Sequence, residues 1–262
     1  HQHPDNLSYI YAEGKDYLTC EDGYNRNILA DNHNVLLVDG EYSDVTNVSD
    51  VYVDSAKERL KNNSDTDIVN NYTAEVYNIE IKDSTVLYQA ETTKIYPEKF
   101  LMKEVSRSFF TDDLSFMVFV NRFSSENEHK YSVINNTCEL AEKISDNEYQ
   151  YNLNKEELIY SVYSEELLEK KQYEQNISAV MTTQEPDKKC TTLIKTLKSE
   201  TKEKCKSSLV FEVYAQKGTK IEYQPHKIVV YGKKKYTIIA KEAFNRYGIS
   251  SDRDIEIKIE NI

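Results

Sequence analysis

The stretch DIEIKIE, residues 254–260, alternates without exception between a charged residue and an isoleucine. Successive side chains of an extended chain point to opposite faces, so this pattern predicts a β-strand with one buried face. Less regular versions, rich in Val, Ile, Tyr, Thr and Phe, recur along the chain. They lie at residues 7–12, 16–20, 35–38, 72–81, 85–95, 114–123, 158–163, 208–215, 220–231 and 236–240. We therefore expect an all-β fold, a large antiparallel β-sandwich that occupies residues 1–262 as one domain.

Helical patterns are scarce and short. Residues 54–61 carry a capping-box spacing from Ser55 to Glu58, and residues 164–175 are rich in Glu, Leu and Lys. Each is expected to form one to three helical turns, which gives the sandwich one or two short helices. In residues 72–81 the apolar phase shifts before Ile79, so we expect a β-bulge near Asn78.

The composition limits the class of protein and of partner. The 21 Tyr and 8 Phe supply large apolar rings for a core, and Gly and Pro together make up only 10 of 262 residues, which excludes collagen-like chains. The 33 basic and 45 acidic residues give a net charge of −12, which argues against nucleic acid or an anionic membrane as a partner. The chain opens on His1 rather than Met, so we expect it to be part of a longer protein.

The four cysteines are few and widely spaced, with no C-x-x-C motif. This spacing favours neither a thiolate zinc site nor a dense disulfide framework. A bridge between Cys190 and Cys205 across a hairpin is one alternative, and free thiols are the other.

The histidines are concentrated near the start of the chain, where three of the five lie at His1, His3 and His33. In an extended segment the first two project to the same side. Two carboxylates, Glu21 and Asp22, precede a turn glycine. Two imidazole nitrogens and one carboxylate oxygen are a ligand set that suits Zn²⁺. From spacing alone, a solvated terminus and a turn histidine are the simpler interpretation, because generic histidine clusters are weak motifs.

Four pieces of sequence recur in a fixed order near the start of the chain: HQHPDNLSYIY at residues 1–11, GKDYL at 14–18, EDGY at 21–24 and HNVLLVDG at 33–40. Together they resemble the heparinase II/III-like polysaccharide lyases, whose pattern is roughly H-x-H-x-D-x-(G/L)-S-F, an acid before G-Y, and H-N-x-(V/L)-x-V-D-G. The resemblance is strong over residues 1–40 and weak over 85–123, from Arg107 to Arg122.

The resemblance implies the C-terminal β-sandwich of such a lyase, without the N-terminal α-helical toroid that forms the other wall of the cleft. It also implies roles for single residues: His1 assists catalysis, and a structural zinc ion is held by His3, Glu21 and His33, with Asp22 as the alternative to Glu21. Asp5 and Asn34 are candidates to orient a zinc-bound imidazole; a cap Asp and a turn Asn are the competing interpretations.

The reaction that the resemblance implies is β-elimination on an acidic polysaccharide of the heparin, heparan sulfate or alginate type. A base removes the proton beside the uronic carboxyl group, and stabilisation of the developing enolate is the large energetic contribution. His1 could stabilise charge or relay a proton, and the isolated chain is expected to be inactive without the toroid.

Two other functions compete with this one. A non-catalytic carbohydrate-binding or scaffold module would use the many tyrosines, although the absence of Trp weakens it. A cupin-like metalloenzyme also uses H-x-H, Glu and His, but there the Glu follows within a few residues, whereas Glu21 lies 18 residues after His3.

Overall fold

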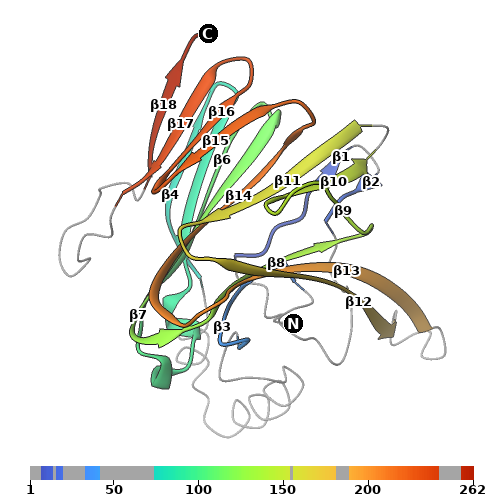
Figure 1. The fold of residues 1–262 in the computed structure, drawn as a ribbon, viewed down its shortest axis with the longest axis vertical. Coiled ribbons are helices and arrows are strands. Elements are labelled where there is room, and N and C mark those ends of the chain that lie inside the picture. Colours follow the sequence, from blue (N-terminus) through green and yellow to red (C-terminus); the bar gives the residue numbers. More distant parts are fainter. Residues whose placement is uncertain are drawn as a thin grey trace, which may run out of the picture.

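The computed structural model describes residues 7–13, 16–19, 33–41, 74–153, 156–180, 189–241 and 255–262. Nearly all regular structure in these ranges is antiparallel β-strand (Figure 1). Two short 3₁₀ turns, η2 (Thr93–Ile95) and η3 (Glu98–Phe100), are the helical elements of the described ranges. The expected all-β sandwich is therefore confirmed.

An eight-stranded sheet forms the middle of the molecule. Its strands, in spatial order, are β4 (Glu75–Lys82), β5 (Thr85–Glu91), β6 (Met102–Asp112), β7 (Phe116–His129), β14 (Cys205–Gln216), β11 (Glu156–Ser164), β10 (Glu148–Leu153) and β9 (Glu142–Lys143).

Two four-stranded sheets cover the two faces of this central sheet. One contains β12 (Leu168–Val180), β13 (Lys189–Thr201), β8 (Tyr131–Thr137) and β3 (Leu36–Val38). The other contains β15 (Lys220–Gln224), β16 (Lys227–Tyr231), β17 (Lys235–Ala240) and β18 (Ile255–Glu260). A short pair, β1 (Ala12–Glu13) and β2 (Asp16–Tyr17), lies apart from these sheets.

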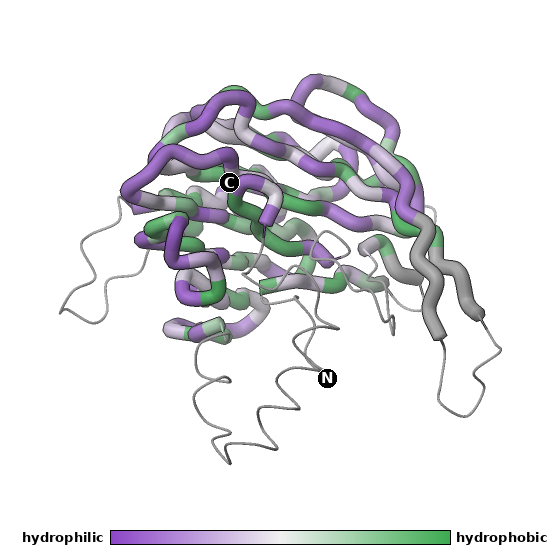
Figure 2. Tube along the Cα trace, turned by 90° about the horizontal axis from the view of Figure 1, so that it is seen from below, coloured by the Kyte–Doolittle hydropathy of each residue, from purple (hydrophilic) through white to green (hydrophobic). Residues whose placement is uncertain are grey.

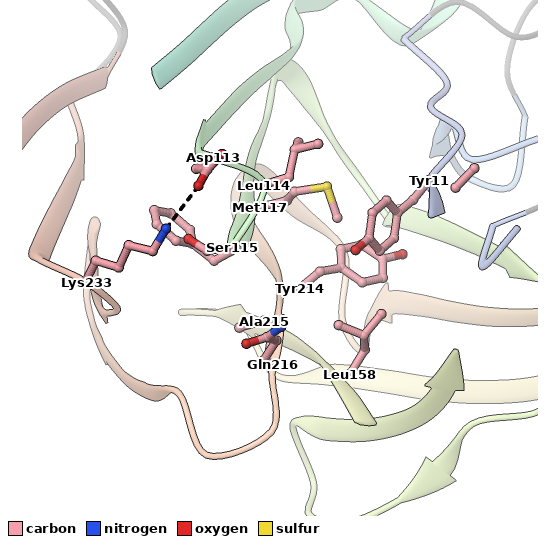
Figure 3. Close-up of a pocket in the computed structure, with 12 residues that line it drawn as sticks. Tyr11, Asp113, Leu114, Ser115, Met117, Leu158, Tyr214, Ala215, Gln216 and Lys233 are labelled. Atoms are coloured by element: carbon pink, nitrogen blue, oxygen red, sulfur yellow. Dashed lines mark hydrogen bonds and ion pairs between the residues drawn. The ribbon is translucent and has the colours of Figure 1, made fainter. Parts of the chain in front are cut away.

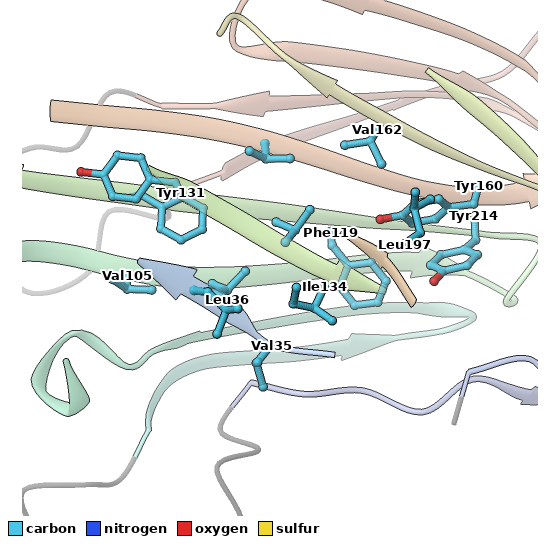
Figure 4. Packing of buried hydrophobic residues seen from close by; sticks show 14 of the residues in the cluster. Val35, Leu36, Val105, Phe119, Tyr131, Ile134, Tyr160, Val162, Leu197 and Tyr214 are labelled. Carbon is cyan, nitrogen blue, oxygen red and sulfur yellow. The ribbon is translucent and has the colours of Figure 1, made fainter. Parts of the chain in front are cut away.

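Two hydrophobic cores lie one on each face of the central sheet, because successive side chains along its strands point to opposite faces. Along β7 the side chains of Phe116, Val118 and Val120 enter the core against β15–β18, and those of Met117, Phe119 and Phe123 enter the other. Figure 4 shows this second, larger core, where Phe119 and Tyr214 meet Leu36 and Ile134 of the facing sheet. Figure 2 shows hydrophobic stretches along the inner strands of the stack. The sandwich thus has three layers.

The predicted bulge in β4 is confirmed, since its register with β5 shifts between Val76 and Asn78. The single strand predicted at 220–231 is wrong: it is the hairpin β15–β16, which turns at Pro225 and His226. His226 has a φ of 57°, and proline followed by a residue of positive φ is typical of a type II turn.

The helix predicted at 164–175 is also wrong. That segment lies mostly in β12, which pairs with β13 without a break from Leu168 to Val180. The helix propensity of Glu, Leu and Lys is worth only a few tenths of a kcal/mol per residue, so an uninterrupted strand ladder outweighs it. The helix predicted at 54–61 lies outside the described residues.

The strand predicted at 7–12 is wrong over residues 7–11, because Leu7 has a φ of 63° and β1 begins only at Ala12. The bridge between Cys190 and Cys205 is not formed, since Cys205 is a free thiol. Cys190 pairs with Ala179 near the far end of the β12–β13 ribbon, whereas Cys205 begins β14 opposite His129.

Candidate functional site

Two of the predicted site residues, His33 and Asn34, lie among the described residues, and both are completely buried at 0% exposure. They directly precede β3, whose residues Leu36–Val38 pair with β8 in the larger core. The other predicted site residues, His1, His3, Asp5, Glu21 and Asp22, lie outside the described residues.

Asn34 connects three segments that are distant in sequence. Its Nδ2 donates to the carbonyl oxygen of Tyr9 at 2.8 Å, and its backbone N–H donates to Ser8 Oγ at 3.1 Å. Its Oδ1 accepts a hydrogen bond from the backbone N–H of Asn136 at 2.5 Å. Asn34 therefore holds the start of β3, and with it His33, against the Ser8–Tyr9 segment and β8.

Arg107 of β6 lies beneath the same two segments and is only 3% exposed. Its Nη1 donates to the carbonyl oxygens of Leu7 and Asn34, each at 2.6 Å. Its Nε donates to Asn121 Oδ1 at 2.6 Å, and its Nη2 lies 3.2 Å from Glu212 Oε2. One guanidinium group thus joins the first and last sequence motifs to the central sheet.

Glu212 of β14 is the acidic partner and is completely buried. Besides Arg107, it accepts hydrogen bonds from Asn121 Nδ2 at 2.6 Å, Tyr160 OH at 2.7 Å and Tyr9 OH at 3.4 Å. A buried carboxylate needs such a set of donors to offset its loss of hydration. We call these residues, together with Tyr214, the Arg107 cluster: Tyr9, Arg107, Asn121, Tyr160, Glu212 and Tyr214.

The tyrosines of the cluster are held in their protonated form. Burial, and then the negative charge of Glu212, raise the pKa of Tyr9 and of Tyr160 well above the usual value. Burial likewise raises the pKa of Tyr214, whose hydroxyl lies 3.0 Å from that of Tyr9. Their hydroxyl groups are therefore hydrogen-bond donors over the whole physiological pH range.

A pocket of about 340 Å³ lies on the other side of Tyr214 (Figure 3). Tyr11, the last residue of the first motif, forms one wall, and the ion pair between Lys233 Nζ and Asp113 Oδ2 (3.0 Å) lies at the opposite side. The remaining lining residues are Ala12, Leu114, Ser115, Phe116, Met117, Leu158, Ala215 and Gln216. Tyr214 thus forms part of both the pocket wall and the Arg107 cluster.

No group of three or more His, Cys, Asp or Glu side chains that could hold a metal ion occurs within the described ranges. Of the predicted zinc ligands, those ranges contain only His33, whose buried imidazole is of the type that Zn²⁺ prefers. The zinc site therefore stays a prediction. The described part of the chain also contains no helix long and apolar enough to cross a membrane.

No family model and no curated protein matches this sequence. The structure, however, matches the crystal structure of heparinase III over 99% of this chain, with a TM-score of 0.60 and 12% identity. It matches heparan sulfate lyase HepC from Pedobacter heparinus equally well, at 12% identity and a TM-score of 0.60 over 99% of the chain. The chain has the fold of the matched part of heparinase III. A third structure, the heparinase III BT4657 gene product, agrees, with a TM-score of 0.61 and 9% identity over the whole chain.

The resemblance to heparinase II/III-like lyases is thus confirmed as a likeness of fold. This chain spans about 36% of the length of heparinase III and 37% of the other two chains. At 9–12% identity, the fold is what the chain shares with them.

Apart from Tyr9, the members of the Arg107 cluster lie outside the four sequence motifs. The signal of the cluster in the sequence was a charged residue within an otherwise apolar strand, as in LVFEVYA at residues 209–215. Because β14 is buried on both faces, Glu212 has no solvent-facing position to occupy and must find partners inside.

Proposed function

We propose that this chain is the C-terminal β-sandwich domain of a polysaccharide lyase that cleaves a uronic-acid-containing polysaccharide by β-elimination. The observation that carries the proposal is the match of the whole chain to heparinase III and to a heparan sulfate lyase. The buried His33–Asn34 motif, joined to the Ser8–Tyr9 segment, supports it.

In the proposed reaction a base removes the proton at C5 of the uronate, the C–H electron pair forms the C4–C5 double bond, and the C4–O bond to the next sugar breaks. The leaving oxygen takes up a proton. An N-terminal α-toroid domain would supply the groups that neutralise the substrate carboxylate, and His1 would stabilise charge or relay a proton. This chain alone would then be catalytically incomplete.

We also propose a structural zinc ion held by His3, Glu21 and His33, with Asp22 in place of Glu21 as the alternative ligand. The complete burial of His33 at the start of a core strand supports this assignment. A zinc ion there would cross-link segments of the chain and supply stability rather than chemistry. Asp5 and Asn34 would hold the ligands in orientation, and Asn34 already holds the backbone next to His33.

A sugar-binding module without catalysis is less well supported. Sugar platforms need exposed aromatic faces, and among the described aromatic residues only Tyr77, at 37%, is exposed by more than about a third. Seven of the described tyrosines, including Tyr131, Tyr151, Tyr160, Tyr214 and Tyr236, are buried in the cores instead.

The test is the absorbance of the unsaturated product at ~232 nm, measured with protein that includes the residues encoded before His1. Heparan sulfate, heparin, hyaluronan and alginate are the substrates, and at least one should be cleaved. His1→Ala should lower kcat by about 100-fold or more, as loss of a positioned acid–base group does, with zinc content and melting temperature near wild type. His3→Ala should instead lose metal and stability first. If His1→Ala empties the zinc site, the two roles are exchanged.

A further inference from the structure

The first and last histidine motifs lie on segments that have little regular structure of their own. Residues 8–11 form no regular element, and β3, which follows His33 and Asn34, is three residues long. Strands this short contribute few ladder hydrogen bonds, so the position of each segment depends on other contacts.

Besides the direct hydrogen bonds from Asn34 to Ser8 and Tyr9, the two segments have a buried side chain as a common partner. Arg107 Nη1 donates to the carbonyl oxygen of Leu7 and to that of Asn34, both at 2.6 Å. These acceptors belong to residues 100 and 73 positions away from Arg107 along the chain. A backbone carbonyl on each segment is therefore held at the same nitrogen atom.

The guanidinium group is itself held rigidly. Nε and Nη2 contact Asn121 on β7, which pairs with β6, and Glu212 on β14, the next strand beyond β7. Its face lies over the rings of Tyr9 and Phe119, at 5.2 and 5.6 Å from their centroids. The planar, forked geometry of arginine permits all these contacts at once, which the single ammonium group of a lysine does not.

We infer that Arg107 is a positioning residue that sets the spacing between the two histidine-bearing segments, with Glu212 as its buried counter-charge. The role rests on the proposed function in so far as those segments carry the proposed zinc ligands. The tethering itself is a property of the fold, so it can be tested whether or not zinc binds.

The test compares three variants by amide hydrogen exchange of the full chain. Arg107→Met removes the tether and leaves Glu212 buried without its counter-charge, so overall stability should fall as well. Arg107→Met combined with Glu212→Gln removes both charges and restores much of that stability, because the uncompensated carboxylate is gone. Tyr236→Phe is the matched control: it deletes the buried hydrogen bond from Tyr236 OH to Asp112 Oδ2 (2.6 Å) in the other core.

The positioning role predicts a local loss of amide protection, and the charge-neutral double variant should not recover it. Protection of the Tyr11, Asn34 and Asn136 amides, which donate to Thr19 Oγ1, Ser8 Oγ and Asn34 Oδ1, should fall by about tenfold or more in both Arg107 variants. Protection of the β17 amides should follow global stability alone. Tyr236→Phe should instead lower the protection of the β17 amides locally, while the protection of the Tyr11, Asn34 and Asn136 amides follows global stability alone.

Equal loss at all amides in the single variant, with full recovery in the double variant, would overturn the inference, because Arg107 would then matter only as a charge partner. Zinc retention after dialysis is the second readout. Both Arg107 variants should retain less metal than Tyr236→Phe, although no proposed ligand is changed. If wild-type protein binds no zinc, the zinc proposal fails, while the exchange pattern still decides the role of Arg107.

Discussion

Single buried polar side chains, each with its partners, connect segments that the strand pattern leaves separate. Arg107 and Glu212 do this beneath the N-terminal motifs, and His129 does it at the end of β7. The ring nitrogens of His129 face Asp39 Oδ2 at 2.8 Å and the carbonyl oxygen of Phe100 at 2.9 Å. Both ring nitrogens of His129 therefore have an oxygen partner within hydrogen-bond distance.

Asp39 gives a pH-dependent contribution to stability. Burial alone would raise the pKa of its carboxyl group, but the hydrogen bonds from His129 and the Lys130 backbone, together with Lys204, lower that pKa overall. A depressed folded-state pKa adds stability above the unfolded value of about 4, and this stability is lost as the pH falls through the folded pKa. Asp39→Asn should therefore unfold at lower urea concentration than wild type at pH 7, and the difference should shrink below about pH 4. A difference that grows on acidification would contradict this.

His33 is the described residue on which the zinc proposal depends. Elemental analysis after dialysis should find about one zinc per chain in the wild type, and His33→Ala should remove it and lower the melting temperature. His226→Ala is the control, because His226 is a half-exposed histidine in a surface pair with Glu165 and should leave both quantities unchanged. Metal-free wild-type protein of undiminished stability would reject the site.

At the scale of the element, the sequence predicts a strand well where one face is exposed to solvent and the other is buried. β17 alternates in this way, whereas β18 alternates in its sequence but buries only Ile255 of its three isoleucines completely. Both strands were predicted within a residue or two of their observed bounds. β8 was missed because all seven of its residues are buried, including Asn135 and Asn136, so it shows no alternation. The Arg107 cluster could not be predicted either, since its members come from separate parts of the chain, such as Tyr9 near the start, Arg107 in β6 and Glu212 in β14.

A buried hydrogen bond between side chains, from Tyr236 OH to Asp112 Oδ2 at 2.6 Å, joins strand β17 to the central sheet. Burial alone would raise the pKa of Asp112. The hydrogen bonds from Ser84 and Tyr236 outweigh this effect, so the pKa is lowered overall. Tyr236→Phe should destabilise the protein by about 1.5–3 kcal/mol, the usual value of a hydrogen bond to a charged group. Urea unfolding at pH 7 measures this. A change under about 0.5 kcal/mol, the usual effect of a surface substitution, would show that the bond contributes little.

At the scale of the whole molecule, two properties predict that the isolated chain is inactive: its net charge of −12, and its span of only about 36% of the length of heparinase III. An acidic domain attracts a polyanion such as the proposed substrate poorly, so in the proposed lyase the groups that bind this substrate should lie mainly outside this chain. The isolated chain should therefore produce no absorbance rise at ~232 nm with heparan sulfate, heparin, hyaluronan or alginate. A steady rise that His1→Ala abolishes would show that the sandwich alone is an enzyme.

The central sheet packs against a hydrophobic core on each face, and this limits where the chain can be truncated. Residues 217–219 connect β14 to β15, and the last four strands, β15–β18, all follow this short connection. In the sequence these four strands therefore resemble a unit that could be removed. Their removal would nevertheless expose Phe116, Val118, Phe211 and Val213, which lie on the back of the strands that carry Asn121 and Glu212. An expression fragment that stops at residue 219 should therefore aggregate, and a successful crystallisation fragment must retain all three layers.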